Sequence, residues 1–153
     1  MALDDRGVQT ALQLFLIVVI IGLSYWLYRS LTEPYEEIRR QEAVTAQTRS
    51  HMQKIRTALI RYEDVNGRYT ADLDSLVMFL RTDSVYQAIG DSLLGPDFDL
   101  ATLPLSPRTG NRFLLSVNDT SRVQTYILRD PDSRDYIGTE LPDITLLNAS
   151  SWE

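Results

Sequence analysis

The chain has 153 residues, a formal net charge of −6 at pH 7 and no cysteine. This length accommodates one compact domain and one additional element, and it excludes a multidomain enzyme. The acidic balance and the lack of a basic patch argue against a nucleic-acid partner, because proteins hold phosphates with Lys and Arg. The absence of cysteine excludes disulfides and thiolate chemistry, and His51 is the only imidazole.

The first predicted element is an apolar helix near the N-terminus. No charged side chain lies between Arg6 and Arg29, and residues 8–28 are long enough to cross the roughly 30 Å hydrocarbon core of a bilayer. A cleaved secretory signal is a poorer interpretation, because acidic residues precede the run and bulky aromatic residues close it. We therefore predict that residues 1–33 form a tail and a retained transmembrane anchor.

Seven residues of this segment are candidates for contact with lipid or with another protein helix. Small or polar side chains inside the apolar run can admit a neighbouring helix or hydrogen-bond to it, although polar residues are also tolerated near the ends of a span. The aromatic residues are typical of an interfacial belt, and the arginine after them can reach the headgroups. The candidates are Gln13, Gly22, Ser24, Tyr25, Trp26, Tyr28 and Arg29.

A helical stalk is predicted after the anchor. Residues 29–63 lack glycine and are rich in helix formers, which predicts one long helix with a kink near Pro34. The polar stretch 39–50 is expected either to cross solvent or to contact a polar partner. From Met52 onward apolar residues recur every three or four positions, which predicts a stripe that packs on a sheet and ends at Gly67.

Two further helical segments are predicted next. Thr70 or Asp72 can cap a second helix, and a short helical turn is expected to start at Ser84. Glycine and proline punctuate residues 90–107, which predicts an irregular connector whose leucines pack against the domain.

The strand signals come late in the chain. Residues 112–117 and 123–128 predict an antiparallel hairpin, and a third strand is expected within 136–141 or 144–147. The predicted fold class is α+β: a transmembrane helix continues into a long, kinked amphipathic helix that packs on a small antiparallel sheet. Residues 34–153 are thus the stalk and one small extramembrane domain.

Charge is distributed unevenly between the two parts of the chain. Residues 1–61 hold 8 basic and 6 acidic side chains, whereas residues 62–153 hold 7 and 15. An acidic surface favours solubility or a basic partner and disfavours docking on anionic headgroups. A merely solvated acidic surface is the alternative interpretation.

Three segments carry a resemblance to a known family. They are LFLIVVIIGL at 14–23, YEDVNGRYTADLDSL at 62–76 and PRTGNRF at 107–113. Together with the order of elements, they resemble the type IV pilin-like superfamily, especially the major pseudopilins of type II secretion. The resemblance implies a pilin-like fold in the bacterial inner membrane, with one span and a periplasmic C-terminal domain, whereas the arginine count beside the span weakly favours a cytoplasmic one.

The chain departs from this family at its assembly signal. Prepilins are cut after a glycine, and a glutamate shortly after the cut neutralises the amine of a neighbouring subunit. Gly7 is suitably placed for the cut, but the matching position is Leu12, or Gln13 if the register slips by one. Because neither residue carries a charge, this departure implies a pilin-like scaffold without the buried ion pair of filament assembly.

The resemblance also implies a calcium site in a late loop. Asp130, Asp132 and Asp135 offer hard oxygen ligands there, and Asp97 with Asp99 forms a second acidic pair. Calcium takes six to eight oxygens, so a solvated turn with neighbouring arginines is the alternative. We expect no resident cofactor, and calcium is the one candidate.

The predicted function is that of a non-catalytic, single-pass accessory subunit of a larger membrane complex, for which a respiratory or photosynthetic assembly is a natural host. Its expected partners are lipid and other membrane subunits, which it contacts through the helix and the acidic domain. The alternative is a pseudopilin or pilus subunit. An enzyme is disfavoured, because His51 lies in a polar stalk without a constellation of catalytic groups.

Overall fold

The computed structural model describes residues 5–95, 98–120 and 122–153, which form an α+β fold as predicted. The chain divides into two units, residues 1–43 and residues 44–153, and helix α1 contributes to both. The elements are α1 (Asp5–Asn66), α2 (Leu73–Thr82), α3 (Ser84–Leu94), the 3-10 helix η1 (Leu100–Thr102), β1 (Leu114–Asn118), β2 (Thr125–Arg129), β3 (Tyr136–Gly138) and the 3-10 helix η2 (Ile144–Leu146).

Helix α1 is one continuous helix from Asp5 to Asn66, and Pro34 does not interrupt it. It ends where predicted, because Gly67 has a φ of +69° and its N–H donates to the Glu63 carbonyl at 2.7 Å. The left-handed conformation is one that glycine adopts without steric cost, so the Asn66-Gly67 pair stops the helix.

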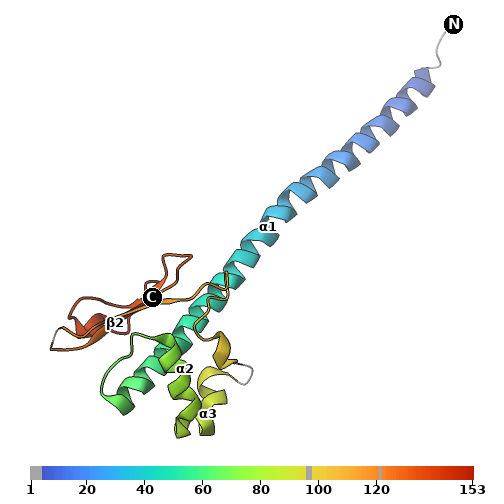
Figure 1. Cartoon of the computed structure of the whole chain (residues 1–153). Coiled ribbons are helices and arrows are strands. Elements are labelled where there is room, and N and C mark those ends of the chain that lie inside the picture. Colours follow the sequence, from blue (N-terminus) through green and yellow to red (C-terminus); the bar gives the residue numbers. More distant parts are fainter. Residues whose placement is uncertain (1–4, 96–97, 121) are drawn as a thin grey trace. The chain divides into compact units, whose positions relative to one another are not determined.

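The second half of α1 supplies the central stripe of the domain core. Met52, Ile55, Ala58 and Leu59 follow the spacing of one helix face, and all four are buried. Within residues 44–153, α1 has the sheet on one side and α2 and α3 on the other (Figure 1), and buried side chains of these elements form one core. The amphipathic stripe predicted from Met52 onward is therefore confirmed.

Helices α2 and α3 are short and depend on side chains at their ends. Asp72 is the N-cap of α2 and accepts hydrogen bonds from the backbone N–H groups of Asp74 and Ser75. Asp83 follows α2 and forms an ion pair at 3.1 Å with Arg61 of α1. The third helical segment is longer than the predicted turn and departs from helical geometry at Ile89.

The sheet has the order β1-β2-β3 and is antiparallel throughout. The hairpin was predicted within two residues of its bounds, and the third strand lies at residues 136–138. Residues 144–146 form η2 instead of a strand. Side chains alternate along the strands, and the core face carries Leu115, Val117, Tyr126, Leu128 and Ile137.

The C-terminal segment covers the free edge of β3. Ile137 pairs with Ser150, and the Ser151 N–H donates to the Tyr136 carbonyl at 2.9 Å. Gly138 has a φ of +90°, and a Cβ atom there would clash with the backbone oxygen of Tyr126. Glycine is therefore required where β3 passes so close to β2.

The connector that precedes the sheet packs down as expected. Leu94 and Leu103 are both buried in the core. The prediction of an irregular segment over residues 90–107 misses the end of α3, which contains Gly90. The core cover thus comes from the last residue of α3 and from Leu103 of the connector.

Candidate functional site

The apolar half of α1 is the first candidate site. Its large hydrophobic side chains are exposed, from 36% for Val19 to 70% for Tyr28. The described residues contain one helix, Gly7–Asn66, that is long and apolar enough to cross a membrane, and its most apolar window is 0% buried. An N-terminal helix of this kind is either a membrane span or a signal sequence.

All seven predicted contact residues lie on this part of α1. Gln13, Ser24 and Arg29 are exposed, and a Cβ atom added to Gly22 would meet no described atom within 4 Å. Successive helical residues are turned by about 100°, so neighbouring aromatic side chains point in different directions around the axis. Tyr25, Trp26 and Tyr28 therefore form a partial ring, as an interfacial belt requires.

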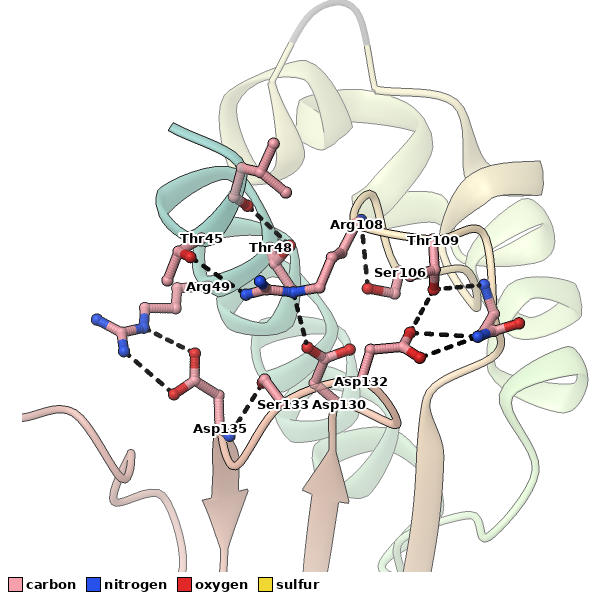
Figure 2. A network of polar contacts seen from close by, with 12 residues as sticks. Thr45, Thr48, Arg49, Ser106, Arg108, Thr109, Asp130, Asp132, Ser133 and Asp135 are labelled. Carbon is pink, nitrogen blue, oxygen red and sulfur yellow. Dashed lines mark hydrogen bonds and ion pairs between the residues drawn. The ribbon is translucent and has the colours of Figure 1, made fainter. Parts of the chain in front are cut away.

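The second candidate site is a polar network that joins α1 to two loops of the domain (Figure 2). Arg49 of α1 donates from Nε and Nη2 to the two carboxylate oxygens of Asp135, at 2.9 and 3.1 Å. Its guanidinium also stacks on the Trp152 ring, 5.1 Å from the ring centroid. The hydrogen bond to Asp135 raises the pKa of Arg49 above its ordinary value, so the guanidinium carries its positive charge beside this carboxyl group.

A second arginine lies deeper in the same network. Arg108 Nε is 3.5 Å from a carboxylate oxygen of Asp130, whose side chain is fully buried. Arg108 also donates from Nη2 to the hydroxyl of Thr45 at 3.2 Å. This contact connects the loop before β1 to α1, and the ion pair connects it to the loop after β2.

The third acidic side chain of the loop has neutral partners. Asp132 accepts hydrogen bonds from the Thr109 hydroxyl and from the side-chain amide of Asn111, the latter at 3.0 Å. The described residues contain no group of three or more acidic or histidine side chains that could hold a metal ion. Asp130, Asp132 and Asp135 thus belong to one loop but have different partners: Asp132 and Asp135 accept hydrogen bonds, and Asp130 forms an ion pair with Arg108 (Figure 2).

Of the second acidic pair considered for calcium, the structure describes one residue, Asp99. Asp99 is the N-cap of η1 and accepts a hydrogen bond from the Ala101 N–H at 2.9 Å. Asp97 lies outside the described residues. The carboxylate of Asp99 therefore has a local structural role.

His51 is built into the domain. One ring nitrogen, Nε2, lies 3.1 Å from the Leu103 carbonyl oxygen, and the ring lies near Phe98 and Phe113 at centroid distances of 5.0 and 5.8 Å. Burial lowers the pKa of His51, and the positive charge of Lys54 lowers it further. The imidazole is therefore neutral at pH 7 and acts as a packed, hydrogen-bonded core group.

Sequence reasoning found the acidic loop and missed its partners. The polar stretch 39–50 was expected either to cross solvent or to meet a polar partner, and its second part meets the chain's own loops through Thr45 and Arg49. Arg108 and Asn111 were not singled out. Three acidic residues within six positions were a usable signal, because such a cluster near a helix needs compensating charge.

Comparison with known proteins gives no assignment. No family model matches the chain, and neither a curated protein nor a solved structure matches it. The architecture itself, a long apolar N-terminal helix followed by a small antiparallel sheet, is consistent with a pilin-like fold.

Proposed function

We propose that this chain is a non-catalytic, membrane-anchored structural subunit of a larger membrane assembly. One observation carries the proposal: among the described residues, the most apolar window of α1 is 0% buried, while the second half of the same helix is the centre of the domain core. Exposed apolar surface of this extent needs lipid or protein around it. The helix then serves as the anchor, and the α+β domain is the extramembrane part that contacts partner subunits.

The positions of the ionisable residues support a structural role. The one imidazole has a nitrogen engaged by a backbone carbonyl, and the arginines of the polar network are paired with carboxylates. General acid–base catalysis needs a titratable group that reaches a substrate. These groups instead join α1 to the loops of the domain.

The alternative function is that of a pseudopilin or pilus subunit, which the pilin-like architecture favours. It requires cleavage after Gly7 and assembly into filaments, whereas position 12 or 13 holds Leu or Gln in place of the charged residue. An uncharged side chain cannot neutralise the amine of a neighbouring subunit. The accessory role needs neither cleavage nor that ion pair, so it fits these residues better.

The deciding experiment is the intact mass of the protein purified from its native membranes in mild detergent, with identification of the proteins that migrate with it. We expect an unprocessed N-terminus and a discrete complex with other membrane subunits. A methylated chain that starts at Val8 and sediments with filaments would overturn the accessory role and establish the alternative.

The side of the membrane on which the domain lies is a separate part of the proposal. We place it in the periplasm, following the resemblance to pilin-like proteins. The chain has no cysteine, so a single Asp119→Cys substitution in an exposed loop provides a unique label site. Labelling of spheroplasts by a membrane-impermeant maleimide is expected, and labelling only after membrane lysis would contradict the periplasmic location.

A further inference from the structure

The loop between β2 and β3 is where a resemblance to major pseudopilins implies calcium, and its residues do not fit that ion. We propose that this loop is closed by two arginines in place of a divalent cation, so that residues 44–153 fold and remain folded without calcium. This inference concerns the domain itself and goes beyond the proposed function.

The carboxylate of Asp135 is already occupied by Arg49. Both of its carboxylate oxygens accept hydrogen bonds from Arg49, and its side chain is largely buried. A bidentate pair between guanidinium and carboxylate has a fixed geometry, and here stacking on Trp152 orients the guanidinium as well. A calcium ion could use Asp135 only after this pair had separated.

The buried carboxylate of Asp130 faces the positive charge of Arg108. Neither oxygen of Asp130 has a hydrogen-bond partner among the described residues, and the nearby positive charge is the Arg108 guanidinium at 3.5 Å. A buried carboxylate needs a counter-charge, and Arg108 provides one without an ion from solution. A divalent cation bound to Asp130 would lie next to that guanidinium and be repelled by it.

The loop offers too few free oxygen ligands for calcium. Calcium takes six to eight oxygens at 2.3–2.6 Å. Asp132 is held by Thr109 and Asn111, so the three carboxylates have separate partners, and the described residues contain no group of three acidic side chains around one centre. The donor set therefore suits arginines and neutral hydrogen-bond donors and does not suit calcium.

Unlike an ion bound within the loop, the two arginines also connect the loop to other segments of the domain. Arg49 belongs to α1, and Arg108 to the loop before β1, where it also contacts Thr45 of α1. The network thus joins the acidic loop to two other segments of the domain and, through Trp152, to the C-terminal segment. Closure of the loop is in this way part of the tertiary fold (Figure 2).

The test is thermal unfolding of the full chain in detergent, followed by near-ultraviolet circular dichroism, in excess EDTA and in millimolar calcium chloride. Magnesium chloride controls for ionic strength and for non-specific binding to acidic residues. We expect the same melting temperature under all three conditions. A calcium-specific rise in melting temperature that is lost in Asp130→Asn would overturn the proposal.

A second measurement tests the arginines directly. Arg49→Gln is expected to lower the melting temperature by about 5 °C, equally with EDTA and with calcium. The matched control is Arg129→Gln, because Arg129 pairs with Glu140 at 3.2 Å while both side chains are more than half exposed. If the two variants melt at the same temperature, Arg49 does not close the loop and the proposal fails. If Arg49→Gln does not fold, the calcium comparison on the unmodified chain still decides.

Discussion

The apolar side chains in the two halves of helix α1 differ in their burial. In the first half of α1, Leu23 is 61% exposed, whereas in the second half Leu59 is fully buried in the domain core. Both residues lie in regular helix, so backbone geometry does not distinguish them. The contrast shows that an apolar side chain contributes to the stability of this fold only where the chain itself provides its cover.

The two regions also differ in their charged residues. The segment between Arg6 and Arg29 carries no charge, as a hydrocarbon environment requires. The domain instead uses charge to fix its parts: Arg49 joins α1 to Asp135, 86 residues later in the chain. One region is thus uncharged and exposed, and the other uses ion pairs to fix its tertiary arrangement.

The largest expected effect comes from matched truncations in the two halves. Leu59→Ala is predicted to lower the free energy of unfolding of the domain by about 3–5 kcal/mol, because it leaves a cavity in the core. Leu23→Ala is predicted to leave that free energy unchanged within error. Denaturant unfolding of the full chain in detergent, followed by near-ultraviolet circular dichroism, measures both. A similar loss in the two variants would mean that the domain also covers Leu23.

Two glycines provide the next comparison. Gly138→Ala is predicted to cost about 2–4 kcal/mol, because φ is +90° there and the new methyl group would press on the Tyr126 carbonyl. Gly22→Ala adds a methyl group with no described atom within 4 Å and replaces a poor helix former by the best one. Its domain should unfold as in the unmodified chain. A harmless Gly138→Ala would contradict the close approach of β3 to β2.

These comparisons also show which parts of the structure the sequence can predict. Helix ends, the apolar stripe after Met52 and the hairpin follow from patterns within a few residues, and they were predicted within narrow bounds. The exception was α3, where polar and apolar residues do not separate into a clear period and Ile89 breaks the helical geometry. Local patterns are therefore sufficient for elements but weak for short helices without strong caps.

The candidate site was only half predictable, for a physical reason. The acidic side chains at 130–135 are adjacent in sequence, but their partners come from α1 and from the loop before β1. Pairing of Arg108 with Asp130 depends on the register of the sheet and on how α1 lies against it, and neither is encoded in a local pattern. The exposed apolar half of α1 was predictable, because a run of uncharged residues defines it by itself.

A smaller effect is expected at the start of α2. Asp72→Ala is predicted to destabilise the domain by about 1 kcal/mol, because the backbone N–H groups of Asp74 and Ser75 lose their acceptor. A ten-residue helix depends on such a cap more than α1 does, since fewer of its backbone groups are bonded internally. Asp119→Ala, in an exposed loop, is the control for loss of one negative charge. Equal stability of the two variants would show that the cap is dispensable.

The smallest expected effect is a pH dependence that belongs to the domain alone. Burial lowers the pKa of His51 in the folded state, whereas the unfolded chain has the ordinary value of about 6.5. As the pH falls below about 6.5, the unfolded state binds the proton first, so stability present at pH 7 is progressively lost. Carboxylates with lowered pKa, such as Asp83, change the stability of the domain mainly below about pH 4. A change in stability between about pH 5 and pH 6.5 therefore reports the titration of His51.

The variant His51→Gln keeps a donor for the Leu103 carbonyl and removes the titration, so its melting temperature should change less across that interval than that of the unmodified chain. The apolar half of α1 has no group that titrates in this interval between Arg6 and Arg29, so its helical signal in far-ultraviolet circular dichroism should persist at both pH values. If the melting temperature of the variant keeps its full pH dependence, a group other than His51 titrates in this interval. The burial of His51 would then not cause the pH dependence. Loss of the helical signal of the apolar half of α1 over the same interval would mean that this half unfolds together with the domain. The two regions would then not be independent parts of the molecule.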